Sequence, residues 1–107
     1  MQEQSRVHVS YILPVFNEES GLEAMVGEAD RRLTVPGNTH EIVIVDDGST
    51  DRTAELAENL SKRRPDKVRV VHLSRNAGYA AAVSAGIASA RGAIVAYARR
   101  QQVERHA

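Results

Sequence analysis

The chain has 107 residues, a length that allows one domain at most. Its 14 basic and 14 acidic residues cancel, which argues against nucleic acid or an anionic membrane surface as the main partner. The lack of cysteine excludes disulfides and thiolate metal sites, and no apolar run approaches the roughly 20 residues that span a bilayer. Residues 1–6 form an N-terminal extension with no basic start and no apolar stretch, so we expect a cytoplasmic protein.

A strand and an amphipathic helix are expected first. The strand covers residues 7–15, and Pro14 ends it because proline cannot donate to a ladder. A helix is expected over residues 18–33, where apolar residues recur at helical spacing. These residues are Leu22, Met25, Val26, Ala29 and Leu33. Asn17 is expected to cap this helix, and the segment 20–23 also fits a capping box.

The second strand is the most informative stretch of the chain. Residues 41–46 are a run of β-branched side chains between two acids, which is typical of a strand buried on both faces of a parallel sheet. The run ends in Asp46 and Asp47, and Gly48 follows. Ser, Thr and Asp come next, and all three favour helix N-termini, so a second helix is expected over residues 51–63.

The remaining elements continue the alternation of strands and helices. A third strand is expected over residues 68–73, a polar loop over 74–78, an alanine-rich helix over 79–90 and a fourth strand over 93–97. The order β-α-β-α-β-α-β, with these spacings, indicates right-handed parallel crossovers and therefore an α/β fold. Residues 98–107 form a polar tail of different character.

Three polar loops follow strands, over residues 14–18, 46–49 and 74–78. In a parallel sheet all three open at the same edge, where ligands of α/β proteins bind. Carboxylates accept hydrogen bonds from bases or ribose, while arginine and helix N-termini hold phosphate, so the loops predict a nucleotide pocket. Each feature alone has a plainer interpretation, because Asp-Gly usually forms a turn and a lone arginine such as Arg75 is usually solvated. The four histidines lack metal-ligand spacing and are interpreted as structural or surface residues.

Taken together, the segments resemble the amino-terminal half of a family 2 glycosyltransferase with the Rossmann-like GT-A fold. The matching segments are 11–19, 42–51 and 73–78, and the most specific is the second, IVIVDDGSTD. The combination is most similar to the branch that transfers sugars to a polyprenyl phosphate, either dolichyl phosphate or undecaprenyl phosphate. The resemblance covers about residues 7–97 and implies an incomplete GT-A half-domain. We therefore predict a four-stranded parallel sheet in the order 3-2-1-4 with helices on both faces, followed by an atypical tail over 98–107.

The resemblance also implies a substrate and a site. The donor would be a UDP- or GDP-sugar, Mg²⁺ or Mn²⁺ would stabilise the departing diphosphate, and the acceptor would be polyprenyl phosphate. Full-length relatives often work at the cytoplasmic face of the membrane. The residues carried over are Pro14, Phe16, Asn17 and Glu18 for the nucleoside, Asp46 for the base or ribose, Asp47 for the ribose and diphosphate, and Arg75 and Gly78 for the base and diphosphate. No catalytic residue and no metal ligand is assigned.

The sequence departs from the family where the metal should bind. The family's fourth strand ends in Asp-x-Asp, and this triplet should fall at residues 99–101, which are Arg-Arg-Gln. One account is a truncated or frame-shifted gene product with an unrelated tail from about Ala98, limited to nucleotide binding. The other is that Arg99 and Arg100 replace the metal, since a guanidinium can bind diphosphate directly. The first account is favoured, so we expect weak nucleotide binding and no turnover.

Two other classes of protein compete with this interpretation. A small interaction module is possible because the strand over residues 93–97 would be an exposed edge, which invites pairing with another chain. A receiver- or flavodoxin-like binding domain is disfavoured, because a receiver has its acids after the first strand and this chain has them after the second.

Overall fold

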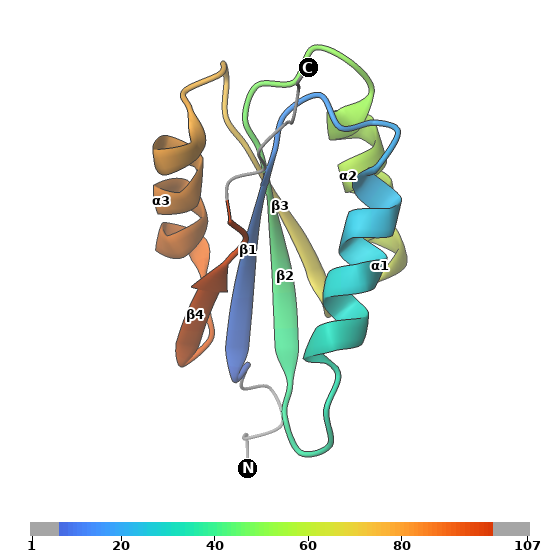
Figure 1. Cartoon of the computed structure of the whole chain (residues 1–107), viewed down its shortest axis with the longest axis vertical. Coiled ribbons are helices and arrows are strands. Elements are labelled where there is room, and N and C mark those ends of the chain that lie inside the picture. The colour runs from blue at the N-terminus through green and yellow to red at the C-terminus, as the bar shows by residue number, and fades with distance from the viewer. Residues whose placement is uncertain (1–6, 100–107) are drawn as a thin grey trace, which may run out of the picture.

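The structure, a computed structural model, describes residues 7–99 and has three layers, with a sheet between helices (Figure 1). In chain order the elements are β1 (Val9–Val15), α1 (Leu22–Leu33), β2 (His40–Asp46), α2 (Thr53–Arg63), β3 (Val68–His72), α3 (Tyr79–Ser89) and β4 (Ile94–Tyr97). The strands lie in the order β3-β2-β1-β4 and pair in parallel, which confirms the predicted fold and strand order. No helix in this part of the chain has the length and apolar composition that a membrane span needs. The predicted extension 1–6 and tail residues 100–107 lie outside the described residues.

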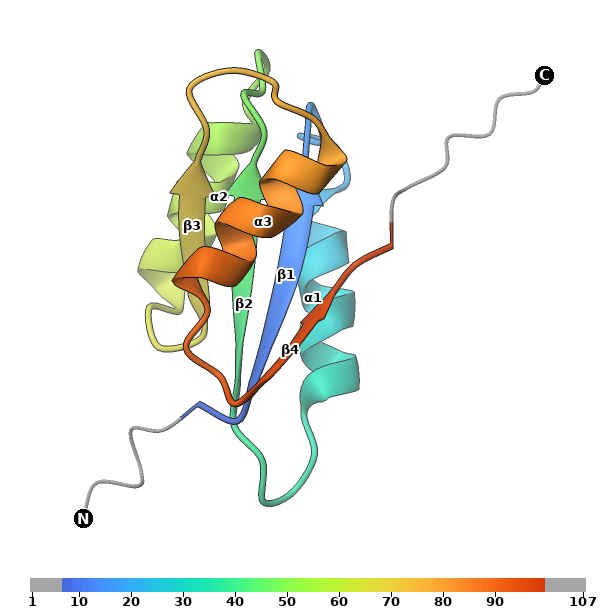
Figure 2. The ribbon, with the colours of Figure 1, turned by 90° about the vertical axis from the view of Figure 1, so that its left-hand side faces the viewer.

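Strand β2 is the centre of the sheet. All seven of its residues are buried, because β1 and β3 pair with its two edges and helices cover both faces. Helices α1 and α2 cover one face, where the core includes Leu13 and Ile44. Helix α3 crosses the other face (Figure 2), where Ala82 belongs to a second core cluster with Ile12 and Val43. The uninterrupted apolar run of β2 follows from this burial on both faces.

Helix α3 lies close to the sheet because its inward side chains are small. Gly86 is buried, and a Cβ added there would lie 2.3 Å from Cγ2 of Ile12 and 3.0 Å from Cγ2 of Val45. No residue larger than glycine fits at this crossing without a shift of the helix or of the Ile12 and Val45 side chains. The contact holds α3 close to β1 and β2, and the start of this helix is part of the site described below.

The start of α1 differs from the prediction. The helix begins at Leu22, and its N-cap residue Gly21 makes no side-chain cap hydrogen bond. The predictions that Asn17 caps this helix and that residues 20–23 form a capping box are therefore wrong. Asn17 has a left-handed φ of 52°, and its side-chain oxygen accepts the backbone N–H of Thr50 at 2.8 Å. The Asn17 side-chain oxygen therefore accepts from the loop after β2 and not from the start of α1.

A buried carboxylate, Glu41, lies near the amino-terminal end of β2 and holds neighbouring segments together. This fully buried side chain accepts hydrogen bonds from Ser10 Oγ at 2.6 Å and from Arg69 Nε at 2.9 Å. It also accepts the backbone N–H of Arg91 at 2.9 Å, and the next N–H, of Gly92, donates to Ser10 Oγ at 2.8 Å. The cluster therefore fixes the connection between α3 and β4 against β1 and β2.

Candidate functional site

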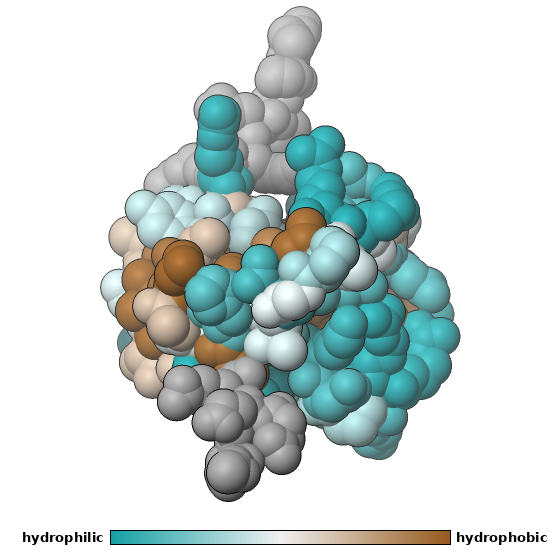
Figure 3. Space-filling model, turned by 90° about the horizontal axis from the view of Figure 1, so that it is seen from below, coloured by the Kyte–Doolittle hydropathy of each residue, from teal (hydrophilic) through white to brown (hydrophobic). Residues whose placement is uncertain are grey.

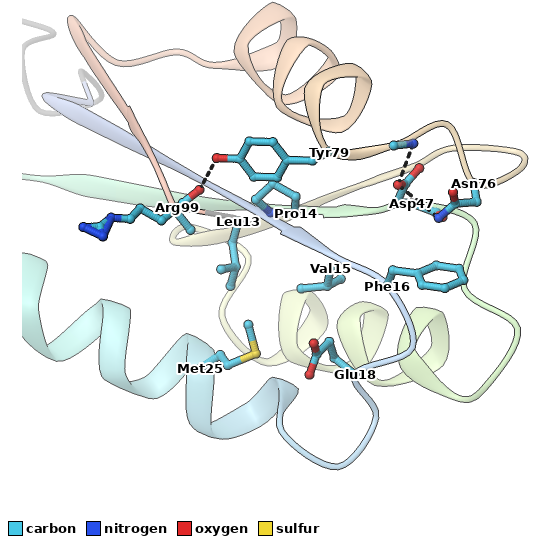
Figure 4. Close-up of a pocket in the computed structure, with 12 residues that line it drawn as sticks. Leu13, Pro14, Val15, Phe16, Glu18, Met25, Asp47, Asn76, Tyr79 and Arg99 are labelled. Carbon is cyan, nitrogen blue, oxygen red and sulfur yellow. Dashed lines mark hydrogen bonds between the residues drawn. The ribbon is translucent and has the colours of Figure 1, made fainter. Parts of the chain in front are cut away.

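A cavity of about 350 Å³ lies at the carboxyl ends of β1 and β4, between α1 and the start of α3 (Figure 4). Its volume is in the range of pockets that bind small molecules. The lining residues are Leu13, Pro14, Val15, Phe16, Glu18, Met25, Asp47, Asn76, Gly78, Tyr79, Ala98 and Arg99. The cavity therefore opens at the sheet edge that the three polar loops predict.

The loop after β1 gives the cavity an apolar and an acidic side chain. Phe16 is 43% exposed, so its ring is open to a ligand. Glu18 donates its backbone N–H to Thr53 Oγ1 at 2.7 Å, which anchors this loop on α2. Its carboxylate lines the cavity and accepts no hydrogen bond from the residues that the structure describes. Glu18 is thus the open acceptor of the cavity.

Asp47 holds the loop that leads into α3. Its carboxylate is buried and accepts the backbone N–H groups of Ala77 at 2.7 Å and Gly78 at 3.0 Å. A third hydrogen bond comes from the side-chain amide of Asn76 at 3.2 Å (Figure 4). The carboxylate of one loop therefore holds the two residues that directly precede α3, in agreement with the preference of helix N-termini for negative charge.

Gly48 brings the two loops into direct contact. Its φ is +73°, and a Cβ at this position would lie 2.4 Å from the backbone C of Arg75 and 2.4 Å from the backbone N of Asn76. A side chain here would therefore meet backbone rather than a flexible neighbour. Glycine is needed at this position both for its conformation and for space.

Asn17 joins the first loop to the second. Its backbone N–H donates to Ser49 Oγ at 2.9 Å, and its side-chain oxygen accepts the N–H groups of Thr50 at 2.8 Å and Asp51 at 3.3 Å. These contacts fix the backbone between Phe16 and Glu18, the two residues of this loop that line the cavity. Asn17 itself is not part of the lining.

Asp46 lies beside the cavity and pairs with a histidine. Its carboxylate, which is almost fully buried, accepts the Ser49 N–H at 3.1 Å and lies 3.2 Å from Nδ1 of His72. The other ring nitrogen of His72 lies 2.6 Å from Oε2 of Glu58. Burial alone would lower the pKa of His72, but hydrogen bonds to Glu58 and Asp46 outweigh it and raise the pKa above its ordinary value of 6.5.

The comparison with known families identifies the chain. Residues 10–98 match the family described as glycosyl transferase family 2. The chain belongs to this family.

The names of curated relatives of this glycosyltransferase chain include a lipid phosphate. The chain is 41% identical over 87 residues to the undecaprenyl-phosphate 4-deoxy-4-formamido-L-arabinose transferase of Pseudomonas aeruginosa, covering 81% of this chain and 26% of the relative. It is 40% identical over 90 residues to the dolichyl-phosphate beta-glucosyltransferase of Homo sapiens, covering 78% of this chain and 28% of the relative. The chain thus spans about a quarter of the length of these relatives and matches their amino-terminal part.

Solved structures with the same fold are GT-A glycosyltransferases. The mannosyltransferase PcManGT from Pyrobaculum calidifontis, in complex with GDP-Man and Mn²⁺, has a TM-score of 0.71 and 28% identity, covering 84% of this chain and 26% of that chain. TarS of S. aureus (1–349), in complex with UDP-GlcNAc, has a TM-score of 0.65 and 29% identity, covering 85% of this chain and 26% of that chain. The resemblance inferred from the sequence motifs is confirmed.

The structure brings together part of the predicted glycosyltransferase site. The predicted residues that line the cavity are Pro14, Phe16, Glu18, Asp47 and Gly78. The other three, Asn17, Asp46 and Arg75, lie outside the lining, where Asn17 and Asp46 hold the loops and Arg75 is exposed.

Several residues of the site are missing from the sequence prediction. Met25 comes from α1, whose inward face was assigned to the core, and Tyr79 is the first residue of α3. The hydroxyl of Tyr79 donates to the carbonyl of Ala98 at 2.6 Å and so ties α3 to the end of β4. His72 pairs in register with Asp46 across β3 and β2, so a register drawn from the hydrophobic pattern could have found it.

The donor set of the cavity does not fit the metal of the family. Residues 7–99 contain no cluster of three or more His, Asp or Glu side chains that could hold a metal ion. Mg²⁺ and Mn²⁺ prefer several oxygen ligands, but the cavity offers only the carboxylates of Glu18 and Asp47, and Asp47 already accepts three hydrogen bonds. Arg99 adds a positive charge to the same lining.

Proposed function

We propose that the cavity binds the nucleoside diphosphate part of a nucleotide-sugar. The observation that carries this proposal is that one cavity lining includes three residues with different binding groups, Phe16, Glu18 and Arg99. The aromatic ring suits the base, the open carboxylate suits base N–H or ribose hydroxyl groups, and a guanidinium suits the diphosphate. The position at the carboxyl edge of a parallel sheet supports the same ligand class.

The relatives support a more specific donor and acceptor. PcManGT was solved with GDP-Man and TarS with UDP-GlcNAc, so we propose a UDP- or GDP-sugar as the donor. The names of the curated relatives include undecaprenyl phosphate and dolichyl phosphate, so a polyprenyl phosphate is the proposed acceptor of the family reaction.

This chain is proposed to bind the donor without transferring the sugar. The family's metal-holding triplet is expected at residues 99–101, and these are Arg-Arg-Gln. Asp47, one of the two acids that line the cavity, is engaged by the residues that directly precede α3. Incubation with labelled nucleotide-sugars and undecaprenyl phosphate tests this, and measurable transfer would contradict it.

Isothermal titration with UDP, GDP and their sugars tests the binding proposal. We expect saturable binding of one of the two nucleotides, with affinity reduced about tenfold in Glu18→Gln, because a charged acceptor of the cavity is lost. The matched control is Asp66→Asn, an exposed acid between α2 and β3 at the other end of the sheet. No binding of either nucleotide, by a chain with an unchanged circular dichroism spectrum, would overturn the proposal.

A second candidate function is self-association through β4. Within residues 7–99 this strand has no neighbour on its outer side. Ile94 donates its N–H group to the carbonyl of His8, just before β1, and Ala98 donates to the carbonyl of Ile12 in β1. The N–H groups of Val95 and Tyr97 therefore point outward. Apolar side chains gather on the side of the molecule that carries α3 and β4 (Figure 3), including the exposed Ile87. A second copy could pair antiparallel with this edge, because the strand contains no charge.

Light scattering after size exclusion tests self-association. Tyr97→Lys should give a monomer if the chain is a dimer, since a charged residue on an edge strand opposes pairing. Val35→Lys is the matched control, because Val35 is a similarly exposed apolar residue in the loop before β2. A chain that stays monomeric at every accessible concentration would contradict this candidate.

A further inference from the structure

We propose that Arg99 holds the diphosphate of the bound nucleotide and that binding requires no divalent cation. This inference rests on the proposed function, because it concerns how the same cavity holds the same ligand. Three features of the described residues carry it: the engagement of Asp47, the position of Glu18 and the unpaired state of Arg99.

The Asp47 carboxylate is turned away from a metal role by its own contacts. One oxygen accepts the Ala77 N–H at 2.7 Å, and the other accepts the Gly78 N–H at 3.0 Å and the Asn76 amide at 3.2 Å. A cation on these oxygens would compete with three donors whose hydrogens carry positive partial charge. Two of those donors directly precede α3, whose N-terminal dipole also opposes a cation.

Glu18 is the other acid of the cavity, and it lies on a different side from Arg99. Glu18 belongs to the loop after β1, whereas Arg99 follows β4. Figure 4 shows these two side chains of the lining apart from each other. A diphosphate beside Arg99 therefore has a guanidinium as its charged neighbour, while the open carboxylate of Glu18 remains for the nucleoside.

Arg99 is one of two arginines without an ion pair in the part of the chain that the structure describes. Seven of the nine described arginines pair with acids, and the two that do not are Arg75 and Arg99. Both follow strands at the carboxyl edge, and Arg99 lines the cavity. A guanidinium that is not engaged by a carboxylate has all five donors available for a bidentate contact with phosphate.

The backbone next to Arg99 is fixed against the cavity. The Ala98 N–H donates to the carbonyl of Ile12 at 2.9 Å, and the Ala98 carbonyl accepts the Tyr79 hydroxyl at 2.6 Å. In Figure 4 the Arg99 side chain extends away from the other labelled lining residues, so the guanidinium reaches a ligand in the cavity by rotation of this long side chain about a fixed backbone. In PcManGT the solved complex contains Mn²⁺ with GDP-Man, so the inference assigns this chain a different source of positive charge.

Titration of the full chain with UDP and GDP, in EDTA and again with Mg²⁺ or Mn²⁺, tests the inference. We expect dissociation constants that agree within about twofold between these conditions. Arg99→Ala should weaken nucleoside diphosphate binding about tenfold, because a bidentate charge-assisted contact is lost. Binding of the nucleoside alone should be unchanged in this variant. Lys62→Ala is the matched control, since it removes an exposed cation from α2, away from the cavity.

The outcomes separate this inference from the proposed function. Binding of UDP or GDP that appears only with Mg²⁺ or Mn²⁺ would overturn the inference and leave the proposed function standing. Wild-type affinity in Arg99→Ala would do the same. No binding of nucleotide or nucleoside in any condition would overturn both. Metal-independent binding that Arg99→Ala weakens and Arg99→Lys partly restores is the expected result.

Discussion

The Asp47 carboxylate accepts the backbone N–H of Ala77, which is 30 residues further along the chain, at 2.7 Å. The contact places the second acid of the Asp-Asp pair at the N-terminus of α3, between two loops of the site. The side chain thus has a positioning role in the free protein, because it orders the loop that carries Asn76 and Gly78 into the cavity lining.

Replacing Asp47 should therefore destabilise the fold as well as the site. In Asp47→Asn an NH2 group replaces one carboxylate oxygen, and this group cannot accept the hydrogen bond from Ala77 or Gly78. We expect a loss of about 2 kcal/mol in the free energy of unfolding, since a buried charged acceptor of three hydrogen bonds is altered. Urea unfolding measures this. Asp66→Asn should change the value by less than about 0.5 kcal/mol, and an Asp47→Asn protein of wild-type stability would contradict the positioning role.

Gly48 and Gly27 should respond to alanine in opposite directions. Gly48→Ala places a Cβ 2.4 Å from two backbone atoms and requires φ near +73°, so we expect a loss of about 3 kcal/mol or more in unfolding free energy. Gly27 lies within α1 with nothing within 4 Å of the added Cβ, so Gly27→Ala should stabilise by about 0.5–1 kcal/mol. Thermal unfolding of both variants checks the contrast. Equal changes in stability in the two variants would contradict the role of Gly48 in the contact between the two loops.

The sequence predicts the fold well because burial leaves a clear pattern. The apolar run of β2 predicts a strand covered on both faces, and all seven of its residues are buried. The small residues of α3 predict a close approach, and Gly86 lies against Ile12. Such signals are local, since each strand or helix carries its own periodicity.

The sequence predicts the site only in part because its contacts are not local. Asn17 could cap the helix that follows or reach another loop, and the choice depends on how β1 and β2 align. In the structure its oxygen meets Thr50, 33 residues away. His72 likewise meets Asp46 through the register of β3 on β2. A polar residue after a strand predicts a place at the sheet edge, but not whether it binds a ligand or its neighbours.

Glu41 should make stability depend on acid pH. Burial alone would raise the pKa of Glu41, but hydrogen bonds from Arg69, Ser10 and the Arg91 backbone outweigh it and lower the pKa to about 2. Because the pKa of the folded state is lower than the ordinary value of 4.5, this stabilisation is complete above pH 4.5 and is lost as the pH falls from 4.5 toward 2. Urea unfolding over this range should show a decrease of about 2–3 kcal/mol.

The variant Glu41→Gln isolates this contribution. We expect it to lower the unfolding free energy by about 2–3 kcal/mol at neutral pH, and to flatten the dependence between pH 4.5 and 2. Glu23→Gln is the control, because the pair of Glu23 with Arg63 is exposed on both sides and should contribute less than about 0.5 kcal/mol. An undiminished pH dependence in Glu41→Gln would assign the acid sensitivity to other carboxylates.

His72 should make stability depend on pH near neutrality, with the opposite sign. Its pKa is raised in the folded state, because Glu58 and Asp46 accept from the two ring nitrogens of the protonated form. The stabilisation is therefore complete below pH 6.5 and is lost as the pH rises through the raised value. An NMR titration of the ring protons should give a pKa above 6.5 in the wild-type protein and a lower pKa in Glu58→Gln. Unfolding of His72→Gln should differ from wild type most at pH 6 and least at pH 8. A His72 pKa below 6.5 would mean that burial outweighs the two carboxylates, and the pair with Asp46 would then be a neutral hydrogen bond.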